Sequence, residues 1–261
     1  MIKKFFRNNY INNNKKMRII ARLDIKNDIL IKSIMYDGVK KLGDPLIYAH
    51  RYFTEGIDEL MIINNTGSLY NTKLNKDLLS KIRKGKAIPI SAGGGISSYD
   101  DAMRLIESGS DKVIINSIIH KNRKDVEKII NALGASSVVG AIQYENRDNN
   151  FLTLYEMARE STGMNLYDTL DLYSNLGVGE VLITDVKRDG CFVGLTDEID
   201  DEISIFYKKM PILLSGGFLD LEEINKKKQF LSGIVVSSSF HYNKVKIDKV
   251  VSRRNEICFN D

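Results

Sequence analysis

The stretch Gly56-Ile-Asp-Glu-Leu-Met-Ile-Ile63 returns in altered form as Gly177-Val-Gly-Glu-Val-Leu-Ile-Thr184, 121 positions later. Three further matches follow the same order and nearly the same spacing. They are Gly94-Gly95 with Gly216-Gly217, Asn116-Ser117 with Ser237-Ser238, and Ala21-Arg-Leu-Asp24 with Gly140-Ala-Ile-Gln143. Four ordered matches indicate a chain built from two similar halves, each of about 120 residues.

Eight short apolar runs alternate with helix-like segments along the chain. The runs are continuously apolar, which is typical of parallel strands covered on both faces. The predicted strands are 18–25, 59–64, 89–92, 112–115, 138–143, 180–185, 211–215 and 233–237. Three helices are predicted to begin or lie at Asp44-Pro45, 98–108 and 220–228. The pattern predicts an α/β fold, a (β/α)8 TIM barrel of two half-barrel repeats, with an open doubly wound sheet as the alternative.

The length and composition suit one such barrel. Its 261 residues place a single barrel domain at 18–253, between a disordered extension at 1–17 and a C-terminal tail at 254–261. The extension is rich in Lys and Asn and lacks the apolar core of a signal peptide. The net charge of +4 is too small and dispersed to indicate nucleic-acid binding. No run of about 18 apolar residues occurs, so a membrane span is not expected.

Cysteine and histidine usage favours a cytoplasmic protein without a metal or a cofactor. The two cysteines, Cys191 and Cys258, form neither a disulfide framework nor a metal-binding spacing. The three histidines lie far apart, with no interval typical of metal ligands.

Glycine and serine pairs close strands in both halves. Gly93-Gly94-Gly95 and Asn116-Ser117 end two strands of the first half, and Ser215-Gly216-Gly217 and Ser237-Ser238 end two of the second. Glycine lets backbone N–H groups point at an anion, and the start of the following helix adds its positive dipole end. One pair alone would favour a simple tight turn. Two pairs related by the repeat favour two phosphate sites that face one common cavity, and therefore a doubly phosphorylated substrate.

Ionisable residues mark both ends of the strands. Asp24 ends the first strand and is predicted to face the mouth of the barrel, where ionisable groups are commonly catalytic. The equivalent position in the second half is Gln143, which forms hydrogen bonds but cannot transfer a proton. The charged residues Arg18, Glu59, Lys112 and Glu180 open four strands. Taken by themselves, these four are read as solvent-facing rim charges. After strand 180–185, Arg188-Asp189-Gly190 is equally a plain turn or a loop that closes on a phosphate.

These residues resemble a known family, the cyclase subunit of imidazole glycerol phosphate synthase. The resemblance covers about residues 17–243. It rests on Arg18-Ile-Ile-Ala-Arg-Leu-Asp24, Gly43-Asp44-Pro45, Gly56-Ile-Asp-Glu-Leu60, Gly93-Gly-Gly-Ile96, Asp111-Lys-Val-Ile-Ile-Asn-Ser117, Arg188-Asp-Gly190, Ser215-Gly-Gly217 and Ser238-Ser-Phe-His241. It implies a duplicated half-barrel and a lyase-type synthase of histidine biosynthesis. Such an enzyme takes ammonia from a glutaminase subunit docked on the amino-terminal face and uses it on a doubly phosphorylated nucleotide.

The resemblance also implies residue roles. Asp24 matches a catalytic aspartate, Gln143 stands where the family has its second catalytic aspartate, and Lys32 matches a substrate-loop lysine. Gly95, Asn116 and Ser117 match one phosphate site, and Asp189, Gly190, Gly217, Ser237 and Ser238 match the other. Arg18, Glu59, Lys112 and Glu180 match the charged gate of an ammonia passage, which replaces the rim-charge interpretation.

The departures from the family pattern leave several functions open. A family aspartate on the second strand appears as Asn64, and Met157 and Ala158 replace a serine and a glycine. The first hypothesis is the histidine-pathway synthase, with Gln143 orienting the substrate. A second is a paralogue that delivers ammonia to a nucleotide-linked surface sugar, and a third is a lapsed barrel that only activates its glutaminase partner. The related isomerase is disfavoured by Gln143 and by the gate residues.

Overall fold

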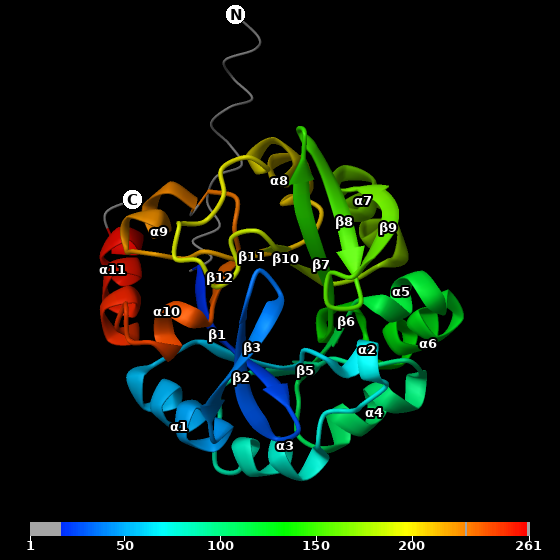
Figure 1. The fold of residues 1–261 in the computed structure, drawn as a ribbon, viewed down its shortest axis with the longest axis horizontal. Helices are drawn as coiled ribbons and strands as arrows, with labels where there is room; N and C mark the ends of the chain where they lie inside the picture. The colour runs from blue at the N-terminus through cyan, green and yellow to red at the C-terminus, as the bar shows by residue number, and fades with distance from the viewer. Residues whose placement is uncertain (1–16, 228, 260–261) are drawn as a thin grey trace, which may run out of the picture.

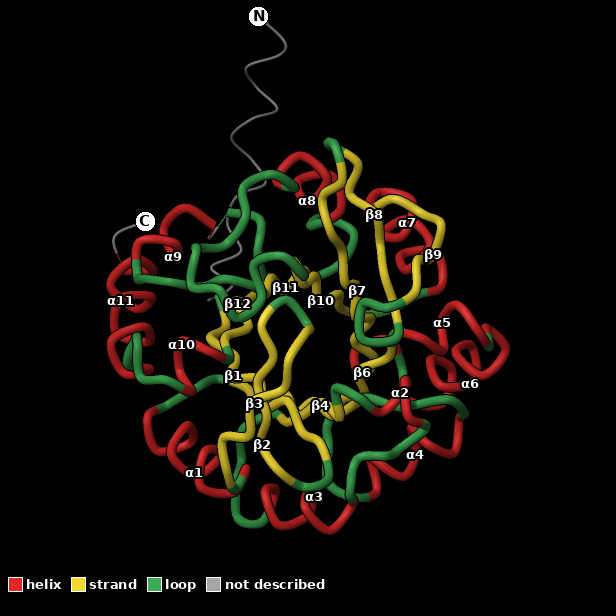
Figure 2. Tube along the Cα trace, viewed as in Figure 1, coloured by secondary structure: helices red, strands yellow, loops and turns green. Residues whose placement is uncertain are grey.

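Eight parallel strands close into a barrel in the computed structural model, which describes residues 17–227 and 229–259. The strands follow the order β10-β11-β12-β1-β4-β5-β6-β7, and β7 pairs with β10 to complete the ring (Figures 1 and 2). Their bounds are β1 Arg18–Lys26, β4 Glu59–Asn64, β5 Ile90–Gly93, β6 Lys112–Ile115, β7 Val138–Arg147, β10 Glu180–Asp185, β11 Ile212–Ser215 and β12 Gly233–Val236. The predicted TIM barrel is therefore confirmed, and all eight predicted strands are present.

Helices surround the ring of strands on its outside (Figure 2). They are α1 Pro45–Glu55, α2 Gly67–Tyr70, α3 Lys76–Arg83, α4 Tyr99–Glu107, α5 Ser117–Lys121, α6 Arg123–Leu133, the 3-10 turn η2 Ala135–Ser137, α7 Leu166–Leu176, α8 Asp200–Phe206, α9 Glu222–Lys227, α10 Ser238–His241 and α11 Ile247–Phe259. The predicted helix starts follow the expected capping chemistry. The Asp44 side chain accepts from the Leu46 N–H and Pro45 begins α1, while Ser98 caps α4 in the same way.

Two segments for which no strand was predicted form antiparallel strands. After β1, the chain forms β2 Ile29–Ile34 and β3 Asp37–Gly43; after β7 it forms β8 Asn150–Tyr155 and β9 Glu160–Asn165. The two-residue turns Asn27-Asp28, Met35-Tyr36 and Asp148-Asn149 have positive φ at both positions. Such turns match the twist of a hairpin, so β1 and β7 both continue into antiparallel extensions. In Figure 1 the β2–β3 hairpin lies over the opening of the ring.

The two segments predicted to flank the barrel domain are described only in part by the structure. Residues 1–16 of the predicted extension lie outside the described residues, and Met17 is buried. The predicted tail from 254 onward begins inside α11, which continues to Phe259. In the described part of the chain, no helix is long and apolar enough to cross a membrane.

The barrel interior is layered along its axis. An apolar layer at mid-height is formed by one residue from each of seven strands: Ile20, Met61, Ile114, Val139, Leu182, Leu213 and Val235. The four strand-opening charges lie on the amino-terminal side of this layer, and the strand ends lie on the carboxyl side. A larger hydrophobic cluster packs the outer face of the strands against the helices. Every second residue of a barrel strand points into the interior. The order of these inward side chains along each strand is therefore the order of the interior layers along the barrel axis.

Candidate active site

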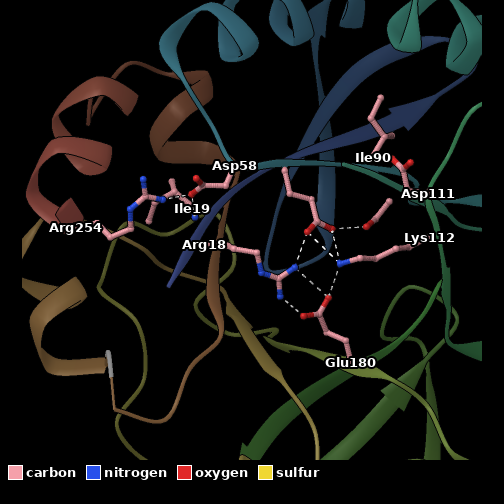
Figure 3. Close-up of polar contacts among 10 residues, drawn as sticks. Arg18, Ile19, Asp58, Ile90, Asp111, Lys112, Glu180 and Arg254 are labelled. Carbon is pink, nitrogen blue, oxygen red and sulfur yellow. Dashed lines mark hydrogen bonds and ion pairs between the residues drawn. The ribbon is translucent and has the colours of Figure 1, made fainter. Parts of the chain in front are cut away.

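The four strand-opening charges form a closed ring at the amino-terminal end of the barrel. Arg18 Nη1 lies 2.6 Å from Glu59 Oε2, and Arg18 also pairs with Glu180. Lys112 Nζ completes the ring, at 3.2 Å from Glu59 Oε2 and 3.1 Å from Glu180 Oε2. Figure 3 shows Arg18, Lys112 and Glu180 pointing toward one another. The two positive and two negative charges balance, and Ser91 Oγ donates to Glu59 Oε1 at 2.5 Å, a partner that the sequence did not suggest.

Two further carboxylates support the strand starts around this ring. The Asp58 carboxylate accepts from the Ile19 N–H and pairs with Arg254 of α11, and the Asp111 carboxylate accepts from the Ile90 N–H. Figure 3 shows Asp58 with Arg254 on one side of the ring and Asp111 with Ile90 on the other. Each carboxylate satisfies a backbone donor at a strand start, so these residues hold the strands that carry the ring.

The first cradle, Gly95, Asn116 and Ser117, lines a cavity at the carboxyl ends of the strands. Gln143, Asn64 and Thr184 line the same cavity, and its floor includes Ile114 and Leu182. Both floor residues belong to the apolar layer of the barrel. The cavity therefore extends from the first cradle down to the layer that separates the mouth from the charged ring.

The second cradle consists of Asp189, Gly190, Gly217, Ser237 and Ser238, which together line a separate cleft. We expected both cradles to open into one cavity. They do lie at the same end of the barrel, but Gly95 and Gly217 line different cavities. The separation has a physical cause, because charged side chains from β1 and the β2–β3 hairpin fill the space between them.

Glycine is required at the same place in each cradle. Gly95 has a φ of 77° and Gly217 a φ of 95°, which L side chains rarely adopt. A Cβ at Gly95 would lie 2.2 Å from the carbonyl oxygen of Thr72, and one at Gly217 would lie 2.2 Å from that of Gly194. The backbone therefore approaches closely in both cradles, as a backbone site for an anion requires.

A buried network of four charges divides the two cradles. Arg22 Nη2 lies 3.0 Å from Asp24 Oδ2 and 3.4 Å from Asp189 Oδ1. Lys32 Nζ, from β2, lies 2.5 Å from Asp189 Oδ2 and 3.5 Å from Asp24 Oδ2. All four side chains are at most 3% exposed, so they are stable only as a balanced set of two cations and two carboxylates.

Arg22 determines the protonation state of Asp24. Burial alone would raise the pKa of Asp24, but the charges of Arg22 and Lys32 hold that pKa below its ordinary value. Asp24 is therefore a carboxylate whose Oδ2 is occupied and whose buried Oδ1 has no hydrogen-bond partner among the described residues. Arg22 was not predicted as a site residue, although its position two residues before Asp24 puts both side chains on the interior face of β1.

Gln143 does not reach Asp24 in this arrangement. Its Oε1 accepts from the Ala158 N–H at 2.8 Å, so the amide holds the β8–β9 turn at the edge of the first cavity. Glu145, the nearest carboxylate along the strand, pairs with Arg147 and with Lys187 at 3.3 Å. The Met157 side chain of the same turn packs against Tyr36 from the β2–β3 hairpin. The two hairpin turns thus meet at the mouth, and Tyr36 lines the first cavity.

Several buried polar atoms at the mouth have no hydrogen-bond partner in the described part of the chain. They are Asn64 Oδ1, Asn65 Nδ2 and Asn116 Oδ1 beside the first cradle, Ser238 Oγ at the second, and Arg22 Nε with Asp24 Oδ1 between them. Natural proteins rarely leave buried polar groups unsatisfied, so their concentration here indicates a site for a polar ligand. No group of three or more potential metal ligands occurs among the described residues.

Comparison with known proteins places the chain in a family. The sequence model of the family described as histidine biosynthesis protein matches residues 18–246. The imidazole glycerol phosphate synthase subunit HisF of Legionella pneumophila is 35% identical over 210 residues, covering 80% of this chain and 99% of that protein. The HisF subunit of Flavobacterium psychrophilum is 32% identical, covering 92% of this chain and 97% of that protein. This chain belongs to the family of histidine biosynthesis proteins that includes the HisF subunits.

Proposed function

We propose that this protein is the synthase subunit that uses ammonia on a doubly phosphorylated nucleotide, as an imidazole glycerol phosphate synthase cyclase. The arrangement along the barrel axis supports the proposal. The charged ring is at one end, two backbone cradles for anions are at the other, and the first cavity reaches the apolar layer between them. The observation that carries the proposal is this floor of Ile114 and Leu182, because an apolar layer lets neutral ammonia pass and opposes the passage of ions.

The amino-terminal face is the proposed docking site for a glutaminase subunit. Ammonia released there would enter at Arg18, Glu59, Lys112 and Glu180, whose charges are mutually paired. Since each of the two carboxylates contacts both cations, one pair can open while the other contacts hold the remaining charges. We propose that the ring acts as the gate of the passage.

At the mouth, the substrate would span the charged network of Arg22, Asp24, Lys32 and Asp189, with one phosphate in each of the two clefts that hold the cradles. Backbone N–H groups near Gly95 and Gly217 and the hydroxyls of Ser117, Ser237 and Ser238 supply the donors. The free Oδ1 of Asp24 would accept a proton from the reacting nitrogen. In this proposal Lys32 holds the β2–β3 hairpin against the second cradle, because its ammonium contacts Asp189.

Turnover of the ribulosyl aminoimidazole-carboxamide nucleotide tests the proposal. The purified chain is assayed with ammonium salts at pH 8, and with glutamine plus a glutaminase subunit of the same source. We expect turnover with both nitrogen donors, and loss of glutamine-dependent turnover alone when Lys112→Met breaks the charged ring. No turnover with either donor would reject the proposal.

A second candidate is favoured by the neutral side chains Gln143 and Asn64 at the mouth. In that case the barrel delivers ammonia to a nucleotide-linked sugar, and the substrate carbonyl is activated by hydrogen bonds rather than by a second carboxylate. The variant Gln143→Asp separates the candidates. Histidine-pathway turnover that appears only in the variant would favour the paralogue. Glutaminase activation without turnover of either substrate would instead identify a lapsed barrel.

A further inference from the structure

The first cavity contains few groups that can donate a proton. Asn64, Asn116 and Gln143 are neutral amides, and Thr184 is an alcohol. The cations of the neighbouring network hold Asp24 as a carboxylate, so Asp24 accepts protons and does not supply them. A reaction that adds ammonia to a carbonyl also needs a donor, because the carbonyl oxygen gains negative charge as the bond forms.

Ser68 and Ser117 are further alcohols in the lining, and, against the effect of burial, carboxylate neighbours hold the pKa of the Arg22 guanidinium well above its ordinary value, so that it keeps its proton. Two side chains in the cavity lining remain as candidates. Glu156 belongs to the β8–β9 turn, but its carboxylate pairs with Lys121 at the outer rim. Tyr36 belongs to the β2–β3 turn, and the residue is 4% exposed. The aromatic ring packs against Leu154, Met157 and Val186, which fix its orientation.

The hydroxyl of Tyr36 faces polar groups of the mouth. The Thr184 side chain is among the polar groups that act on the phenol, and the Arg22 guanidinium carbon lies 6.0 Å from the ring centroid. The charged groups that act on the phenol are Arg22, Asp24 and Asp189. Burial raises the pKa of Tyr36 to about 12, so the phenol carries its proton at neutral pH. The φ of Tyr36 is 61°, a conformation that non-glycine residues rarely adopt and that recurs at functional sites.

We propose that Tyr36 is the proton donor of the ammonia-addition step. This inference rests on the proposed function and goes beyond it, because neither the family resemblance nor the repeat assigns a role to this residue. The nitrogen of ammonia forms a bond to the carbonyl carbon, and the electron pair of the broken C=O π bond moves to oxygen. That oxygen takes the phenolic proton. Asp24 removes a proton from the new ammonium nitrogen, and transfer of this proton to the phenolate restores both side chains.

The substitution Tyr36→Phe tests this role because it removes only the hydroxyl and keeps the packed ring. We expect kcat with ammonium to fall by about 100-fold or more, with KM for the nucleotide within about threefold. Tyr48→Phe is the matched control. Its hydroxyl contacts the Leu42 carbonyl oxygen of the same hairpin at 3.4 Å, away from the cavity, so kcat should stay within about twofold.

A second measurement distinguishes proton donation from a structural role. A fluorinated tyrosine at position 36, with a more acidic phenol, should shift the basic limb of the kcat profile to lower pH while binding is kept. An unchanged kcat in Tyr36→Phe, an unmoved limb, or a large loss in Glu156→Gln with none in Tyr36→Phe would each overturn the inference. In these cases wild-type turnover leaves the proposed function intact. Absence of turnover in the wild-type protein would instead reject the proposed function, and the inference with it.

Discussion

The two halves of the barrel differ most where the repeat makes them equivalent. On β1 the interior positions near the mouth carry Arg22 and Asp24, whereas on β7 the equivalent positions carry Ala141 and Gln143. The charged pair Arg22 and Asp24 forms ion pairs with Asp189 and Lys32, and the four side chains fill the space beside the second cradle. The small and neutral pair leaves the first cavity open down to the apolar layer. Duplication has therefore kept the backbone cradles alike, while the side chains of β1 make one half of the mouth ionic and closed and those of β7 leave the other half of the mouth neutral and open.

The largest expected effect comes from removing the proton acceptor of the ionic half. Asp24→Asn keeps the shape of the side chain and eliminates the carboxylate, so ammonium-dependent kcat should fall by about 10²–10⁴-fold. The equivalent change in the neutral half, Gln143→Asn, should cost less than about tenfold, because the shorter side chain only loses its contact with the Ala158 N–H. Steady-state kinetics of the two variants measures the contrast. Equal losses would show that the halves contribute equally to the chemistry.

The next effect concerns the stability of the ionic half. Arg22→Met leaves Asp24 and Asp189 buried with Lys32 as their one remaining cation in the network. We expect the free energy of unfolding at pH 7 to fall by about 3–5 kcal/mol, because an uncompensated buried charge is strongly destabilising. Urea unfolding followed by circular dichroism measures this loss. Arg22→Lys keeps the charge and should recover part of the lost stability; no recovery would point to packing as the cause.

The two cradles should respond alike, since their backbones are alike. Gly95→Ala and Gly217→Ala each place an alanine in a left-handed conformation and bring its Cβ against a carbonyl oxygen. Each should destabilise the protein by about 1–3 kcal/mol and weaken the binding of inorganic phosphate in calorimetric titrations. Gly134→Ala is the control, because Gly134 has a φ of 78° with nothing within 4 Å of an added Cβ. If Gly134→Ala cost as much as the other two, close approach would not be the reason for glycine in the cradles.

The smallest expected effect is a shift in acid stability. The folded-state pKa of Asp24 lies below its unfolded value of about 4, so Asp24 contributes stability above that value. This contribution is lost as the pH falls through the folded pKa. In Arg22→Met, the charge of Arg22 no longer offsets the effect of burial, so the pKa of Asp24 is higher. The loss of stability should therefore begin at a higher pH. Unfolding midpoints measured between about pH 3 and 6 should begin to fall at a lower pH in the wild-type protein than in Arg22→Met. Coincident curves would contradict the conclusion that Arg22 lowers the pKa of Asp24.

Much of the barrel could be predicted from local patterns. The apolar runs, the helix caps and the repeat gave eight strands and the barrel closure, and the strand-end positions of Gly95 and Gly217 put both cradles at one end. The hairpin extensions were missed at Met35-Tyr36, because neither residue is typical of a two-residue turn with positive φ. At Asn27-Asp28 and Asp148-Asn149 the turn residues themselves were a usable signal.

The sequence by itself determined which residues face the interior, because a parallel strand alternates its faces and the repeat sets the strand positions. It therefore determined that Arg18, Glu59, Lys112 and Glu180 share one end of the barrel and that Asp24 lies at the other. Only the tertiary structure decided which of these charges meet. The contacts of Arg22 with Asp189 and of Lys32 with Asp24 join residues from different strands and loops, and Coulomb energies in a buried site depend on distances of a few ångströms that no spacing in the sequence specifies.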